Sequence, residues 1–267
     1  MSYFGIDGAT VNTTDYLIEV AKGNVAGASL INKFGANTAL ASSYEPVSIG
    51  GIYRTQQVGS AQTLRVKAGN VNDTAAGLGA REITIEGLDA TGALQTASVA
   101  TAGGSASANF SGTWIRVFRA YVSASGVYAT QGGGSHAGDI VVEDSTGTFD
   151  WLTIDATSFA KGQSQIACYS VPLGFTAFVL DYSVTMNANK TVDFTFFKRE
   201  NILETAAPYS AMRLAFQEIG LTQPFNRKFS DPLVFPELTD VGVMAQGQQS
   251  PEVTADFNIL LIDNTTL

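Results

Sequence analysis

The chain contains a single histidine, His136, which stands in a glycine-rich stretch together with Ser135 and Asp139. A hydroxyl, an imidazole and a carboxylate are the three groups of a nucleophilic triad, in which the imidazole takes the proton of the hydroxyl. A triad needs side chains that rigid elements aim at one another, and small polar residues close together in a glycine-rich turn do not provide that geometry. The sequence therefore favours an exposed turn histidine over a catalytic one.

Two other patterns that could indicate chemistry are excluded by the residues around them. Residues 77–81, with two glycines before an arginine, resemble a phosphate-binding loop, but such a loop opens a helix, and residues 82–86 alternate as a strand. A glycosidase needs two carboxylates across a cleft, whereas the acidic residues here are scattered through one stretch: Asp139, Glu143, Asp144, Asp150 and Asp155. The single cysteine, Cys168, is too few for an intrachain disulfide or a cysteine-based zinc site. We therefore predict no enzyme, no cofactor and no metal.

The aromatic side chains allow two interpretations. Trp114, Trp151, Tyr182, Phe196 and Phe197 could form an exposed surface on which a sugar ring stacks. Most aromatic residues of a β-sandwich instead lie in its core. The sequence favours the core but leaves the sugar-binding surface open.

The formal net charge is −9, from 15 Lys and Arg against 24 Asp and Glu. An acidic chain without a basic cluster is not expected to bind nucleic acid or an anionic membrane surface. No apolar run approaches the roughly 18 residues of a membrane span, and the first residues lack the basic and apolar regions of a secretory signal. Apolar residues make up 45% and charged residues 15%, which predicts a large core and a neutral polar surface.

The elements around these residues follow a period of two, which marks half-buried strands. Alternating segments cover 63–68, 82–86, 115–121, 140–142, 178–186, 192–196 and 212–216, with glycine-rich turns between the earlier ones, and 257–262 is a strongly apolar segment. We expect 187–190 to close a hairpin and 257–262 to be a central strand. The predicted fold is all-β, with two antiparallel, jelly-roll-like β-sandwich domains at 46–157 and 158–267, joined by a linker near 155–163.

Residues 1–45 are predicted to form an extended N-terminal arm. A short helix is expected over 14–23, capped by Thr14 and ended by Gly23. The arm carries apolar residues that it cannot bury by itself: Tyr16, Leu17, Ile18, Val20, Leu30, Ile31 and Phe34. We expect them to be buried against the chain's own sheets, a sister subunit or another protein of the assembly.

Four segments carry a resemblance to a known family: 25–35, 171–180, 229–243 and 253–263. Together they resemble uncharacterised virion structural proteins of tailed bacteriophages. The resemblance implies a virion protein assembled in the bacterial cytoplasm, namely a capsid decoration or cement protein that binds the major capsid protein or other virion proteins. A tail, collar or head-fibre component that binds host glycans is the alternative. The resemblance also implies a homotrimer, because a capsid shell offers three-fold positions.

Strand edges give an independent reason to expect self-association. A β-rich chain must protect its edges, and this one has few charges with which to do so. We expect the long alternating strands at 175–199 and 253–263 to need partners or cover. Pro232 and Pro236 cannot lie in a central strand, so an edge is expected there.

Overall fold

The computed structural model describes residues 2–4, 10–12, 15–128, 134–156, 161–187 and 189–266. Its regular structure is almost entirely antiparallel β-sheet, so the all-β prediction is confirmed. Strands β1 (Ser2–Phe4) and β2 (Thr10–Asn12) pair with each other, and helix α1 (Tyr16–Ala21) follows them. None of the helices among the described residues has the length and apolar character needed to cross a lipid bilayer.

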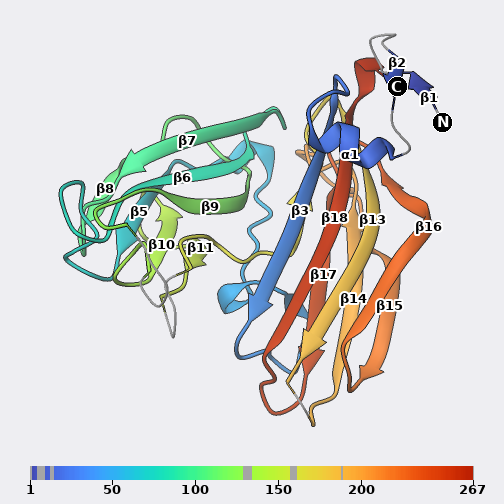
Figure 1. Cartoon of the computed structure of the whole chain (residues 1–267). Helices are drawn as coiled ribbons and strands as arrows, with labels where there is room; N and C mark the ends of the chain where they lie inside the picture. Colours follow the sequence, from blue (N-terminus) through green and yellow to red (C-terminus); the bar gives the residue numbers. More distant parts are fainter. Residues whose placement is uncertain are drawn as a thin grey trace.

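The larger unit is a sandwich of two sheets, drawn in blue, yellow, orange and red in Figure 1. One sheet has the strand order β16-β13-β18-β3 and the other β12-β17-β14-β15, with β4 added beside β17. Their bounds are β3 (Ala28–Asn37), β4 (Glu45–Pro46), β12 (Cys168–Ser170), β13 (Phe175–Met186), β14 (Val192–Arg199), β15 (Arg213–Leu221), β16 (Phe225–Phe235), β17 (Asp240–Gly247) and β18 (Val253–Asp263). Apart from β14 to β15, each step from β12 to β18 crosses to the other sheet, as in a jelly roll.

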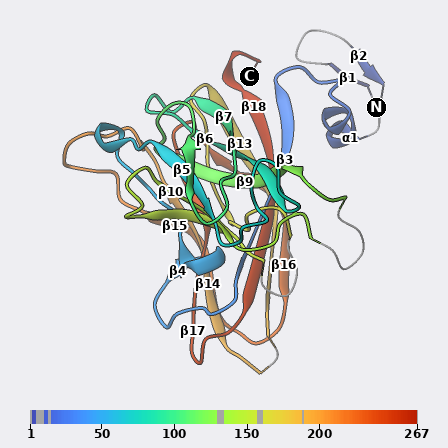
Figure 2. The same cartoon turned by 90° about the vertical axis from the view of Figure 1, so that its left-hand side faces the viewer.

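The smaller unit, here called the insert, interrupts this sandwich between β4 and β12. It has a sheet of order β11-β10-β5-β8 and a sheet of order β7-β6-β9. Their bounds are β5 (Leu64–Ala68), β6 (Ala80–Leu88), β7 (Leu94–Ala100), β8 (Ala106–Asn109), β9 (Arg116–Ser125), β10 (Ile140–Asp144) and β11 (Asp150–Ile154). Figure 2, viewed from the insert's side, shows it in front of the sandwich.

This topology changes the expected domain boundaries. The predicted domain 46–157 corresponds closely to the insert, but the second sandwich is not confined to 158–267, because β3 and β4 belong to it. The expected linker at 155–163 lies partly outside the described residues. Its described end runs along β9, where Tyr121 bridges Gln163 and the Ser164 amide donates to the Ala120 carbonyl over 2.8 Å.

The hairpin predicted around 187–190 is wrong. Strands β13 and β14, which flank this turn, lie in opposite sheets: β13 pairs with β16 and β18, whereas β14 pairs with β15 and β17. Alternation shows that two segments are strands but does not show which strands they pair with. The prediction of a central strand at 257–262 is confirmed, because β18 lies between β13 and β3.

The segment predicted as an arm also contributes to the fold. Helix α1 is confirmed, but Asp15 caps it by accepting a hydrogen bond from the Leu17 amide, and Thr14 lies outside the described residues. After Gly23, which has φ of +76°, the chain enters β3, which pairs with β18 over ten residues. Residues 28–37 are thus an integral strand of the sandwich, and their extended shape serves the chain's own sheet.

Candidate functional site

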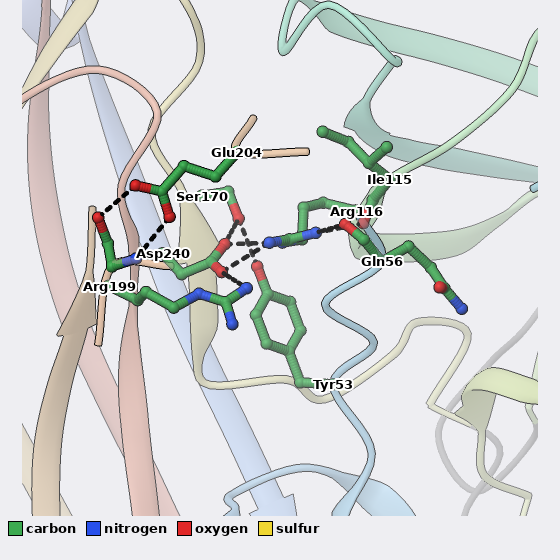
Figure 3. Close-up of polar contacts among 9 residues, drawn as sticks. Tyr53, Gln56, Ile115, Arg116, Ser170, Arg199, Glu204 and Asp240 are labelled. Atoms are coloured by element: carbon green, nitrogen blue, oxygen red, sulfur yellow. Dashed lines mark hydrogen bonds and ion pairs between the residues drawn. The ribbon is translucent and has the colours of Figure 1, made fainter. Parts of the chain in front are cut away.

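A fully buried ion pair joins the insert to the sandwich. Arg116 in β9 and Asp240 at the start of β17 have side chains that are 0% and 1% exposed. The guanidinium donates from Nε to Asp240 Oδ1 over 2.7 Å and from Nη2 to Oδ2 over 2.8 Å. Its Nη1 donates to the backbone carbonyls of Gln56 and Ile115, each over 2.7 Å. All three guanidinium nitrogens are thus hydrogen-bonded, as a buried charge requires (Figure 3).

Three more side chains surround Asp240. Ser170 in β12 donates to Asp240 Oδ1 over 2.5 Å, and its hydroxyl oxygen lies 2.6 Å from that of Tyr53. Because Ser170 gives its only proton to the carboxylate, Tyr53 is the donor in the second bond. Arg199, at the end of β14, places Nη2 3.3 Å from Asp240 Oδ2. We call Tyr53, Arg116, Ser170, Arg199 and Asp240 the junction cluster.

The electrostatics of the junction cluster suit a permanent link. Burial opposes the charge of Arg116, but the attraction of Asp240 and the hydrogen bonds to it outweigh burial, so the pKa of Arg116 is raised. Burial also raises the pKa of Tyr53 well above its ordinary value, and the charge of Asp240 adds to this effect. The phenol therefore remains a hydrogen-bond donor. The cluster can hold two β units in one orientation, and sequence reasoning missed it.

A second buried cation lies at the same contact. Lys33 in β3 is 3% exposed, and its Nζ donates to the backbone carbonyl of Phe118 in β9. The same Nζ lies 5.6 Å from the centre of the Phe118 ring. Burial, together with the positive charge of Arg119, lowers the pKa of Lys33 to about 7. A neutral amine can still donate to the carbonyl, so the contact survives loss of the proton.

Three of the four helix residues predicted as an interface lie against the chain's own sandwich. Val20 belongs to a small apolar group with Leu260 and Ile262 of β18, and Tyr16 and Leu17 pack against this group.

The other four predicted interface residues divide between buried and open positions. Ile31 packs against the main core of the sandwich, whereas Leu30 and Phe34 line a hollow beside the insert. Ile18 and Leu30 are 50% and 39% exposed. The structure therefore does not bring the seven residues together as one surface.

The sugar-stacking surface considered from the sequence is wrong for the residues named. Trp114, Trp151, Tyr182, Phe196 and Phe197 are all between 0% and 4% exposed. Tyr182 and Phe196 meet edge to face in the core of the sandwich, with ring centres 6.1 Å apart. These aromatics are core, and a site for sugar rings must use other residues.

His136 is not an exposed turn residue, because it is 4% exposed. Its Nδ1 donates to the Gly138 carbonyl over 2.8 Å, while Asp139 accepts from the Ala156 amide. The organiser of this turn is the buried carboxylate of Asp73, which accepts from the backbone amides of Ala80, Ala137 and Gly138. In the described part of the chain, no group of three or more His, Cys, Asp or Glu side chains could hold a metal.

The exposed edges of the sandwich lie far from the insert, at β15 and β16 (Figure 1). Within the described residues, β15 pairs only with β14, and β16 only with β13. This corrects the expectation that segments 175–199 and 253–263 are unprotected, because β13, β14 and β18 are all interior strands. The edge expected at Pro232 is confirmed, since this residue lies in β16.

These two strands expose apolar side chains as well as backbone. Leu214 and Ile219 of β15 are 59% and 71% exposed, and Val234 of β16 is 56% exposed. Phe216 and Phe229 line a hollow of about 360 Å³ between the two strands. The Arg227 guanidinium lies 5.8 Å from the ring centre of Phe216 and 5.4 Å from that of Phe229. Open strand edges with apolar side chains mark association surfaces. We call this region the β15–β16 edge.

Comparisons with known proteins give no family. No family model matches the chain, and no curated protein matches its sequence. Among solved structures, a chain of infectious bursal disease virus, Gx strain, aligns over 88% of this chain and 72% of its own, with 10% identity and a TM-score of 0.24. The corresponding Gt strain structure aligns over 88% and 75%, with 8% identity and a TM-score of 0.19.

Replacing Arg116 tests the junction. Arg116→Met leaves the buried Asp240 carboxylate without its main partner, so we expect the free energy of unfolding to fall by about 3–5 kcal/mol. The double variant Arg116→Met/Asp240→Leu removes both charges and should recover most of this loss. Urea denaturation of the wild type, both single variants and the double variant measures the coupling. A double variant as unstable as the sum of the singles would contradict the proposed pairing.

Lys33 should make stability depend on pH. Its folded-state pKa lies below the unfolded value, so the unfolded chain binds more protons above pH 7, and its contribution to stability rises as pH rises through 7. Lys33→Met should therefore stabilise the protein most at pH 6, with an advantage smaller by about 2–3 kcal/mol at pH 9. Urea denaturation at the two pH values measures this difference. An equal advantage at both would show that Lys33 does not titrate in this range.

Proposed function

We propose that the chain is a structural protein of a tailed-bacteriophage virion, acting as a capsid decoration or cement protein that binds and stabilises the shell. The observation that carries this proposal is the β15–β16 edge, two neighbouring edge strands that expose apolar side chains. Such a surface is suited to binding another protein. The sequence segments that resemble phage virion proteins supply the biological setting.

The fold is compatible with this role by analogy. Jelly rolls recur in viral capsid domains and in lectins, although a shared fold does not by itself imply a shared function. The buried junction cluster adds a mechanical reason. It holds the insert and the sandwich in one orientation, so a contact made by one unit also positions the other.

Self-association through the β15–β16 edge is part of the proposal, with a trimer as the expected state. The edge carries three basic residues, Arg213, Arg227 and Lys228, against two acidic ones, Glu218 and Asp231. Arg213 pairs with Glu200 at the end of the neighbouring strand, and Arg227 lies 3.9 Å from Glu218, so the edge has no net charge with which to direct a partner. Its exposed apolar side chains are the part that a partner would cover.

The composition of purified phage particles tests the role. Quantitative mass spectrometry should find the chain in particles that have been purified by density gradient. Copy numbers in the hundreds are expected for a protein that covers the shell. A dozen copies or fewer would replace the decoration role by the tail, collar or head-fibre alternative. Absence from the particles would refute both.

Charge placed on the edge should disrupt association. Ile219→Lys or Leu214→Lys introduces an unpaired ammonium where apolar side chains are expected to meet a partner, so we expect at least a tenfold rise in the dissociation constant. Light scattering should then report the monomer mass of 28.1 kDa at concentrations where the wild type is larger. Val71→Lys, at a position of the insert that is 80% exposed, is the matched control. A monomeric wild type at tens of micromolar would contradict self-association in solution.

A further inference from the structure

A hollow of about 290 Å³ lies beside the junction cluster. One wall is the segment between β4 and β5 that carries Gln56 and Gln57, and the other is the loop after β14, with Asn201 and Tyr209. Figure 3 shows Arg199 and Glu204 on the sandwich side of this region and Gln56 beyond Arg116, with the Gln56 backbone carbonyl facing Arg116 and its side-chain amide pointing away from Arg199. The volume is near the lower limit for small-molecule sites, so it suits a single ring.

Arg199, the cation that lines this hollow, has N–H donors that the described part of the protein does not use. Arg199 is 32% exposed, and within the described residues its hydrogen bond is the 3.3 Å contact from Nη2 to Asp240 Oδ2. Asp240 already has a bidentate partner in Arg116, which neutralises its charge. A guanidinium has five N–H donors, so Arg199 retains both charge and donors for a ligand. Planar, charge-assisted pairing with a carboxylate is what this group does best.

The other lining groups favour hydroxyls and an apolar ring face. Gln57 accepts from the Ser60 amide and hydroxyl with its backbone carbonyl, so its side-chain amide can donate to and accept from a ligand. Asn201 donates to Ser210 Oγ over 3.0 Å, which leaves its carbonyl oxygen available. Tyr209 is 51% exposed and offers an aromatic face at the rim.

Glu204, the acidic residue of the lining, does not bind the free donors of Arg199. Glu204 accepts from the Ser210 amide with Oε2 over 2.5 Å and from the Ser210 hydroxyl with Oε1 over 2.8 Å. Both oxygens are therefore engaged within their own loop. The same bonds fix the loop that presents Tyr209.

We propose that this hollow binds an acidic sugar of the hexuronate class. Its carboxylate pairs with Arg199, its ring hydroxyls bond to the amide of Gln57, and its apolar ring face lies on Tyr209. A bare carboxylate would leave this amide and the aromatic face unused, and a neutral sugar would leave the remaining charge-assisted donors of the guanidinium unused. The site stands on its own lining and does not depend on a virion role for the chain.

Saturation-transfer NMR and calorimetry with the full-length protein test the site. The probes are D-galacturonic and D-glucuronic acid, with D-galactose as the neutral control and acetate as the bare carboxylate. At least one hexuronate should bind, at least tenfold more tightly than galactose or acetate. Arg199→Met should weaken this binding at least tenfold, and Tyr209→Ala should remove the transfer to the ring protons.

Matched variants separate binding from folding. Arg213→Met removes an exposed arginine that pairs with Glu200, and Tyr128→Ala removes a tyrosine that is 94% exposed on the insert; both should bind as the wild type does. Gln57 lies outside the junction cluster and its backbone, not its side chain, bonds to Ser60, so Gln57→Ala should weaken binding without lowering the melting temperature. The proposal is overturned if neither hexuronate binds at tens of millimolar, if acetate or galactose binds equally well, or if Gln57→Ala and Tyr209→Ala bind unchanged.

Discussion

The arrangement of the two β units depends on one buried ion pair. A jelly roll that accepts more than one hundred residues between its first strands must hold them against its side, and Arg116 with Asp240 does so from residues 124 positions apart. A buried pair contributes little net stability, because desolvation offsets most of the attraction. Its effect is on geometry. Only one orientation of the insert satisfies the guanidinium, the carboxylate, Ser170 and Tyr53 at once, and any other leaves a charge unpaired in an apolar interior.

Close packing supports the same arrangement. The core of the sandwich includes Leu88, Ile115 and Phe118 from the insert, so the two units share apolar surface. At Gly35 in β3, a β-carbon would lie 2.0 Å from the Val47 carbonyl oxygen. The backbone at Val47 and Ala167, on either side of the insert, therefore packs directly against the backbone of β3. Only glycine leaves enough space at this position.

Much of the strand content could be predicted, because alternation reports burial on one face of a strand. Pairing could not be predicted, since it depends on partners far away in the chain. Strand β3 shows this clearly: its ten residues are rich in small and polar side chains and look like an arm, yet they pair with β18 more than two hundred positions later. The turn at 187–190 looked like a hairpin for the same reason. A local turn can join strands of one sheet or of two, and only the complete sandwich decides.

The junction cluster left a weaker signal that reasoning from single motifs missed. Arg116 stands in the apolar run from Trp114 to Phe118, and a charge within a buried strand implies a buried partner. Nothing in the sequence indicates which of 24 carboxylates that partner is. The hollow beside Arg199 is harder still to predict, because its walls come from two segments that meet only when the insert docks.

The insert and the β15–β16 edge lie on opposite sides of the sandwich (Figure 1), and this polarity limits how copies can associate. On the insert side, Arg119 of β9 donates to the Asn32 carbonyl of β3 over 2.9 Å, so the insert occupies that side. An edge that meets itself about a two-fold axis closes after two copies, whereas a three-fold ring requires the edge to meet a different surface of the next copy. The ion pairs of this edge are made within the chain, Arg213 with Glu200 and Arg227 with Glu218, so charge selects neither arrangement. A three-fold ring instead needs a second surface of the chain, away from the edge, that covers the exposed apolar side chains of β15 and β16.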